Sequence, residues 1–135
     1  MTKPIVLVVE EEALVRMSAV HMVEDAGYAV LQARNADEAI EILERRSDVR
    51  VVFTDFTMSG SMDGLRLAEV IRDRWPPIYL IVASGLDVRD KLPANTRFIR
   101  KPYAAEHIAG VLGDLLGSDP APQTSNNGSG CAKVA

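Results

Sequence analysis

Residues 51–55, Val-Val-Phe-Thr-Asp, form a short apolar run of β-branched and aromatic residues that stops on a carboxylate. The polar stretch 57–61 follows, which predicts a buried strand that ends in a loop. In an open α/β sheet, ligands bind beyond the carboxyl ends of the strands, near the point where the strand order reverses. Asp55 is therefore the first candidate for a functional residue, with simple loop capping by its side chain as the alternative.

The rest of the chain alternates between strand-like and helix-like patterns. Further strands are predicted over 5–9, 28–32, 78–83 and 98–100, and helices over 13–26, after Asn35, over 64–75 and along the apolar stripe from Ile108 to Leu116. The charged segment 86–93 predicts at most two marginal helical turns. Such regular alternation is typical of a parallel sheet with helices on both faces.

Several helix boundaries have local signals. Asn35, followed three residues later by Glu38, predicts an N-cap for the second helix, and Asp63 predicts one for the third. Pro76-Pro77 ends the third helix, because proline lacks the N–H that a helix needs. For the first helix we expect a buried face made of Leu14, Met17, Val20 and Met22 or Val23, with Gly27 as the stop.

Composition limits the class of protein. The chain has 135 residues, of which 47% are hydrophobic, and these values predict one globular domain over 1–117 with a disordered tail over 118–135. A net charge of -4 disfavours a nucleic-acid surface. No signal-like or bilayer-spanning run occurs, so we expect a cytoplasmic protein that contacts no membrane. Cys131 is the only cysteine, which excludes an internal disulfide.

Polar side chains stand at the carboxyl ends of four predicted strands, which all face one edge of a parallel sheet: Glu10 and Glu11, Asp55, Ser84, and Lys101. Carboxylates crowded together repel one another, and a bound Mg²⁺ with oxygen ligands would relieve that repulsion. A carboxylate beside Mg²⁺, with an ammonium and a hydroxyl nearby, is equipped to accept a phosphoryl group. Asp55 would be the nucleophile.

Five motifs, in register over residues 4–117, make the chain resemble the receiver domain of two-component response regulators. They are Val8-Val9-Glu10-Glu11-Glu12, Phe53-Thr54-Asp55, Met62-Asp63-Gly64, Ser84-Gly85 and Lys101-Pro102-Tyr103. The resemblance implies a flavodoxin-like, doubly wound sheet of five parallel strands in the order 2-1-3-4-5. It also implies a single-domain signalling protein that is not an enzyme and whose output is a changed protein-binding surface.

The resemblance further implies roles for individual residues. A sensor histidine kinase would phosphorylate Asp55, and Mg²⁺ would be held by Glu11, Asp55 and the backbone carbonyl of Thr57. Ser84 would be the switch hydroxyl, Phe98 the switch aromatic residue, and Lys101 would bind the phosphoryl group. The downstream partner is not identified, and a homodimer is left open.

One departure from the family pattern affects the metal. Glu11 stands where the family usually has Asp, and its extra methylene moves the carboxylate outward by about one bond length. Because Mg²⁺ demands near-ideal octahedral geometry, this change predicts weaker binding than an aspartate would give.

Three alternative functions follow from the same residues. Weak metal binding would favour a receiver-fold adaptor that binds its partner without being phosphorylated. An aspartyl-nucleophile phosphatase of the haloacid dehalogenase kind needs a second Asp two residues after the first, where this chain has Thr57. A flavin or nucleotide carrier needs glycines and free N–H groups after the first strand, where this chain has the acids 10–12.

Overall fold

The computed structural model describes residues 3–58, 60 and 62–117; the predicted tail over 118–135, with Cys131, lies outside these ranges. Five strands are present, each close to its predicted place: β1 (Ile5–Val9), β2 (Ala29–Ala33), β3 (Val49–Asp55), β4 (Tyr79–Ser84) and β5 (Thr96–Arg100). The α-helices are α1 (Ala13–Asp25), α2 (Ala36–Arg45), α3 (Gly64–Arg74) and α4 (Ala105–Leu116). Among the described residues, no helix is both long enough and apolar enough to cross a bilayer.

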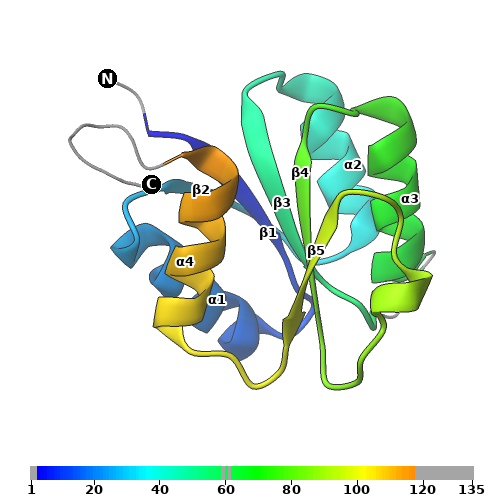
Figure 1. Cartoon of the computed structure of the whole chain (residues 1–135). Coiled ribbons are helices and arrows are strands. Elements are labelled where there is room, and N and C mark those ends of the chain that lie inside the picture. Colours follow the sequence, from blue (N-terminus) through cyan, green and yellow to red (C-terminus); the bar gives the residue numbers. More distant parts are fainter. Residues whose placement is uncertain (1–2, 59, 61, 118–135) are drawn as a thin grey trace.

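All neighbouring strands pair in parallel, in the order β2-β1-β3-β4-β5, which confirms the predicted topology. Helices α1 and α4 lie on one face of the sheet, and α2 and α3 lie on the other (Figure 1). The carboxyl ends of all five strands therefore reach the same edge, because parallel strands run in one direction.

Two apolar cores fill the space between the sheet and its helices. Side chains alternate between the faces along each strand, so Val6 and Val8 pack toward α1 and α4, whereas Leu7 and Val9 pack toward α2 and α3. Strand β1 is apolar throughout, and β3 has the buried apolar run Val51, Val52 and Phe53 between Arg50 and Thr54, as expected for strands that are covered on both faces.

Local signals at the helix ends are confirmed. The Asn35 side chain accepts a hydrogen bond of 2.8 Å from the Glu38 N–H, and the Asp63 side chain accepts one of 2.9 Å from the Arg66 N–H. Gly27 follows α1 with a φ of 103°, a left-handed conformation that favours glycine. The Asn35 and Asp63 side chains each satisfy an N–H group that has no partner inside its helix.

The predicted buried face of α1 is wrong in its first turns. Leu14 is 82% exposed and Met17 is 51% exposed, whereas Ala19, Val20 and Val23 are buried against the sheet. These three residues and Arg16 share one stripe at helical spacing, and Leu14 lies on the opposite side. The sequence allows two apolar faces for α1, one with Leu14 and Met17 and one with Ala19, Val20 and Val23. The second face, with small and β-branched residues, packs against the sheet.

The segment between β4 and β5 contains only the 3-10 turn η1 (Arg89–Lys91), in agreement with the prediction of at most two marginal turns. Around the turn itself the polar contacts are local, since Asp87 accepts hydrogen bonds from the backbone and the side chain of Arg89. The ends of the segment are held by other elements: Arg72 of α3 donates to the carbonyls of Ala94 and Asn95, and Arg100 of β5 donates to the carbonyl of Gly85. Val88 is the buried anchor of this segment. Few apolar contacts hold the turn, so its local stability is low.

Candidate functional site

The centre of the site is an ion pair between the ends of two strands. Asp55 is the last residue of β3, and Lys101 follows the last residue of β5. The Lys101 ammonium lies 2.8 Å from Oδ1 of Asp55, although 45 positions separate the residues in sequence. Only 13% of the Asp55 side chain is exposed, so this charge depends on its partner more than a surface charge would.

Glu10 contributes a second carboxylate to the same edge. The residue directly follows β1 and is buried, and its Oε2 accepts a 3.1 Å hydrogen bond from the Glu12 N–H. Burial raises the pKa of Glu10, and the negative charge of Asp55 raises it further, against the lowering effect of the Glu12 N–H and of Lys101. Glu10 and Asp55 are thus close enough to repel each other.

Ser84 joins the ends of β4 and β5. Its buried hydroxyl accepts a 3.1 Å hydrogen bond from the Leu86 N–H, and its backbone carbonyl accepts one of 2.8 Å from the Lys101 N–H. Between the same two strands, the side chain of Arg100, the last residue of β5, donates to the Gly85 carbonyl at 2.7 Å. The placement of the lysine therefore depends directly on the end of β4.

Gly64, the first residue of α3, lies against the backbone of the proposed nucleophile. Its N–H donates a 3.0 Å hydrogen bond to the Phe56 carbonyl. A Cβ added at Gly64 would lie 1.8 Å from the Asp55 carbonyl oxygen, a distance that no side chain can occupy. The Asp-Gly pair at 63–64 thus caps α3 and lets the helix approach the end of β3 closely.

Tyr103 closes the apolar side of the site. Its ring packs edge-on against Phe53, with ring centroids 5.6 Å apart and an interplanar angle of 61°. Burial, together with the charges of Glu10 and Asp55, raises the pKa of Tyr103 to about 12. The sequence included Tyr103 in a motif without a role, and the structure places it close enough to Glu10 and Asp55 for their charges to act on its hydroxyl.

Three other predicted site residues lie further out. Glu11 and Thr57 are exposed, and Phe98 is half-buried on the edge strand β5, in register with Val82 of β4. Glu10, Asp55, Ser84 and Lys101 are therefore the predicted residues that the structure brings together at buried or half-buried positions.

Of the three carboxylates expected together, Glu10 and Asp55 lie at the site, whereas Glu11 is exposed. Among residues 3–58, 60 and 62–117, no three His, Cys, Asp or Glu side chains are grouped closely enough to hold a metal ion by themselves. Mg²⁺ commonly uses one or two carboxylates and keeps several waters, and Glu10 and Asp55 form such a pair. Burial, and to a lesser extent the charge of Asp55, raises the pKa of Glu10, and a divalent cation beside the two carboxylates would offset both effects, so the donor set fits Mg²⁺.

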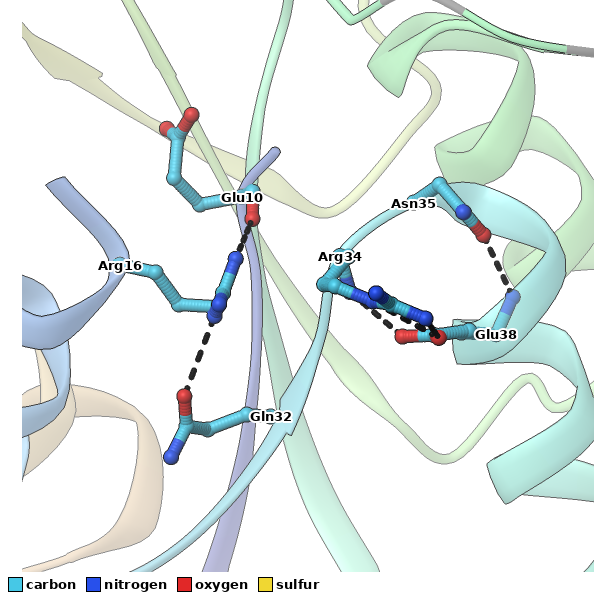
Figure 2. A network of polar contacts seen from close by, with 6 residues as sticks. All are labelled: Glu10, Arg16, Gln32, Arg34, Asn35 and Glu38. Atoms are coloured by element: carbon cyan, nitrogen blue, oxygen red, sulfur yellow. Dashed lines mark hydrogen bonds and ion pairs between the residues drawn. The ribbon is translucent and has the colours of Figure 1, made fainter. Parts of the chain in front are cut away.

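Sequence reasoning missed Arg16, which supports the site from α1. Nη1 of Arg16 donates a 2.8 Å hydrogen bond to the Glu10 carbonyl, and Nε donates one of 3.1 Å to the Gln32 side chain on β2 (Figure 2). The signal was present in the sequence as a charged residue at i, i+3, i+4, i+7 spacing with Ala19, Val20 and Val23. It was hidden because Leu14 and Met17 suggested a different buried face.

Comparison with known proteins agrees with this geometry. The family model described as the response regulator receiver domain matches residues 6–112. The chain is 34% identical over 117 residues to the sensor kinase CckA of Brucella abortus, and 32% identical over 110 residues to the nitrogen assimilation regulatory protein NtrX of Azorhizobium caulinodans. These matches cover 82% and 76% of this chain but only 12% and 24% of the two relatives.

A solved structure shows the same fold. The response regulator receiver protein from Sinorhizobium medicae superimposes with a TM-score of 0.77 at 21% sequence identity. The alignment covers 86% of this chain and 96% of that one.

Proposed function

This chain belongs to the response regulator receiver domain family, and we propose that it receives a phosphoryl group on Asp55 from a sensor histidine kinase in the cytoplasm. In this proposal the domain is a signalling module of a two-component system, and its output is a change in its own protein-binding surface. The downstream partner is a protein that distinguishes the two states of that surface.

The observation that carries the proposal is the ion pair between Asp55 and Lys101 at 2.8 Å, with Ser84 and Glu10 beside it at the carboxyl edge of the sheet. A phosphoryl group brings three acceptor oxygens and a charge of about -1.5 to -2 at neutral pH. An ammonium already held at the acceptor carboxylate is placed to pair with those oxygens as they arrive.

The transfer itself requires little covalent help from the protein. An Asp55 carboxylate oxygen attacks the phosphorus of a phosphohistidine, so an O–P bond forms while the P–N bond breaks and the imidazole leaves with its bonding electrons. Lys101 neutralises charge on the phosphoryl oxygens, and the Ser84 hydroxyl is a donor within the same edge. Tyr103 and Phe53 form an aromatic pair beside the carboxylates.

We further propose that Glu10, Glu11, Asp55 and the Thr57 carbonyl are the groups that hold Mg²⁺, with Glu10 and Asp55 as its buried carboxylates. When bound, Mg²⁺ supplies positive charge that offsets the negative charge of the phosphoryl oxygens. Glu11, which is exposed and longer than the aspartate common in the family, would be the weakest of these ligands.

Phosphorylation with a small-molecule phosphodonor, with and without Mg²⁺, tests the proposal by intact mass. We expect the wild-type chain to gain the mass of one phosphoryl group in the presence of Mg²⁺, and Asp55→Asn to gain none. Asp63→Asn is the matched control, because asparagine caps a helix as well as aspartate does and the residue lies outside the carboxylate pair. Labelling of Asp55→Asn equal to that of wild type would overturn the assignment.

A second candidate function rests on the exposed position of Glu11 and on the reduction of the acidic group to two carboxylates. These features favour an adaptor that keeps the receiver fold and binds its partner without phosphorylation. In the same experiment, an adaptor gives no labelling of the folded wild-type chain even at high Mg²⁺ concentration.

A further inference from the structure

We propose that Arg16 is a positioning residue that fixes the backbone of Glu10 and thereby sets the Mg²⁺ affinity of the site. This inference rests on the proposed function, because it assigns a role to Arg16 in the same metal site. The role is separate from those of the residues that would touch the metal or the phosphoryl group.

The position of Arg16 on α1 explains its reach. The residue lies on the stripe that faces the sheet, one turn before Ala19 and Val20, which are buried. Helical side chains lean toward the N-terminus of their helix, so a long side chain in the first turn extends back over the start of α1. The end of β1 lies there, and the Arg16 guanidinium meets the Glu10 carbonyl at 2.8 Å.

Glu10 is consequently held at three points. Its N–H donates a 3.1 Å hydrogen bond to the Ala33 carbonyl of β2, its carbonyl accepts from Arg16, and its carboxylate accepts from the Glu12 N–H. Arg16 also bonds the Gln32 side chain, so its guanidinium spans β1 and β2 (Figure 2). Loss of Arg16 would leave the Glu10 carbonyl without this hydrogen bond. Glu10 is the first residue after β1, so its backbone would be less firmly held where the strand passes into the acidic loop 10–12.

Arg16 acts by fixing the position of the Glu10 backbone, because its guanidinium bonds the Glu10 carbonyl and not the carboxylate. In Figure 2 the Glu10 carboxylate extends away from the Arg16 guanidinium, and the bond between the two residues goes to the carbonyl. The charges that shift the pKa of Glu10 are those of Asp55, Lys101 and Glu12. A partner that fixes a ligand without touching the metal is expected to change metal affinity by about 10–100-fold when removed.

The test is the Mg²⁺ affinity of the full chain, measured by isothermal titration calorimetry for wild type and for Arg16→Met, which keeps the stem of the side chain and removes its donors. We expect about a tenfold loss of affinity, at the lower end of the range because the bond goes to the backbone of the ligand. Melting temperatures in the presence of EDTA report any general loss of stability separately from the loss of metal binding.

Two control variants separate positioning from other effects. Arg34→Met removes the same charge from a nearby arginine that pairs with Glu38, and it should leave the affinity unchanged (Figure 2). Gln32→Leu breaks the tie between α1 and β2 but keeps the bond to Glu10, so it should also leave the affinity unchanged. If Arg16→Met does not fold, Arg16→Gln, which remains polar but lacks the guanidinium, is titrated instead with the same expected loss.

The outcomes distinguish this inference from the proposed function. A wild-type chain that binds Mg²⁺ and takes up the phosphoryl group, together with an Arg16 variant of equal affinity, overturns the role of Arg16 alone. Equal losses in Gln32→Leu and Arg16→Met also overturn it, because the tie to β2 would then be the cause. A folded wild-type chain that neither binds Mg²⁺ nor gains the phosphoryl mass overturns both.

Discussion

At the scale of single residues, the site is defined by a charge imbalance that the fold maintains. Glu10 is buried next to Asp55, and a single ammonium, that of Lys101, pairs with Asp55 at 2.8 Å. Two carboxylates and one ammonium leave a net negative charge in a partly dry environment. The charged form of Glu10 is therefore destabilised in the folded chain, and a bound cation or a proton would relieve this destabilisation.

This imbalance predicts a pH-dependent effect of Glu10→Gln. The pKa of Glu10 is raised in the folded state above its ordinary value of 4.5, so the folded chain binds more protons than the unfolded chain between the two values. Stability therefore falls as the pH rises through that window, and the full cost is present at neutral pH. In EDTA, we expect Glu10→Gln to be more stable than wild type at neutral pH, and the difference to vanish below a pH of about 4.5.

Urea unfolding at both pH values measures this difference. Glu24→Gln, an exposed acid near the other end of α1, is the control for the change in net charge. A Glu10→Gln variant that is less stable than wild type at neutral pH would show that the Glu12 N–H contributes more to Glu10 than burial costs.

At the scale of elements, the packing of α3 against the end of β3 positions Asp55, the proposed phosphoryl acceptor. The helix begins at Gly64, whose N–H bonds the Phe56 carbonyl, and Asp63 caps it. The Phe56 N–H in turn donates a 2.8 Å hydrogen bond to the Ala83 carbonyl of β4, so hydrogen bonds join the loop after Asp55 to both α3 and β4. The close approach of helix and strand depends on the missing side chain at Gly64.

We predict that Gly64→Ala destabilises the fold by about 1–3 kcal/mol, because the new Cβ must displace the Asp55 backbone. Gly110→Ala is the matched control, since this exposed glycine lies within α4 and its Cβ would meet nothing within 4 Å. Removing the flexibility of a helical glycine should stabilise the fold by roughly 0.5–1 kcal/mol. Urea unfolding measures both, and a Gly64→Ala variant as stable as wild type would contradict the close approach.

At the scale of the whole molecule, helix α2 and the segment that contains η1 differ in how strongly they are held to the rest of the fold. Helix α2 has a hydrogen-bonded cap and buries Ala36, Ala39 and Leu43. The segment that contains η1, by contrast, begins at Ser84, whose hydroxyl holds the Leu86 N–H, and it has Val88 as its buried anchor. We therefore expect a change at the ion pair of Asp55 and Lys101 to reach η1 through Ser84, whose carbonyl bonds the Lys101 N–H, more directly than it reaches α2.

We predict that beryllium fluoride with Mg²⁺, a mimic of the phosphoryl group, changes amide hydrogen exchange first in residues 86–92 and around Phe98. If the Ser84 hydroxyl turns toward the mimic, the Leu86 N–H loses its acceptor, and the weakly anchored segment shifts its population. Exchange in α2 should stay unchanged. Asp55→Asn with the same additives is the control, and uniform changes over the chain would contradict a directed response.

The sequence by itself determined the elements and the family. Continuous apolar runs marked the strands, and Asn35, Asp63 and Gly27 marked helix ends, because these signals act through neighbouring residues. Five motifs in register indicated the receiver family, and the match over residues 6–112 confirms it. The residues of the carboxyl edge were also predictable, because the direction of parallel strands brings their ends together.

Only the tertiary structure decided which of the predicted groups meet and what supports them. The rotation of α1 about its axis is set by packing against the sheet, so periodicity alone could not show that Leu14 is exposed and Arg16 faces β1. The 2.8 Å ion pair of Asp55 with Lys101 and the contact of Gly64 with the Asp55 backbone join residues from different elements. Their distances depend on how helices and strands pack in three dimensions, and this information is not local in the chain.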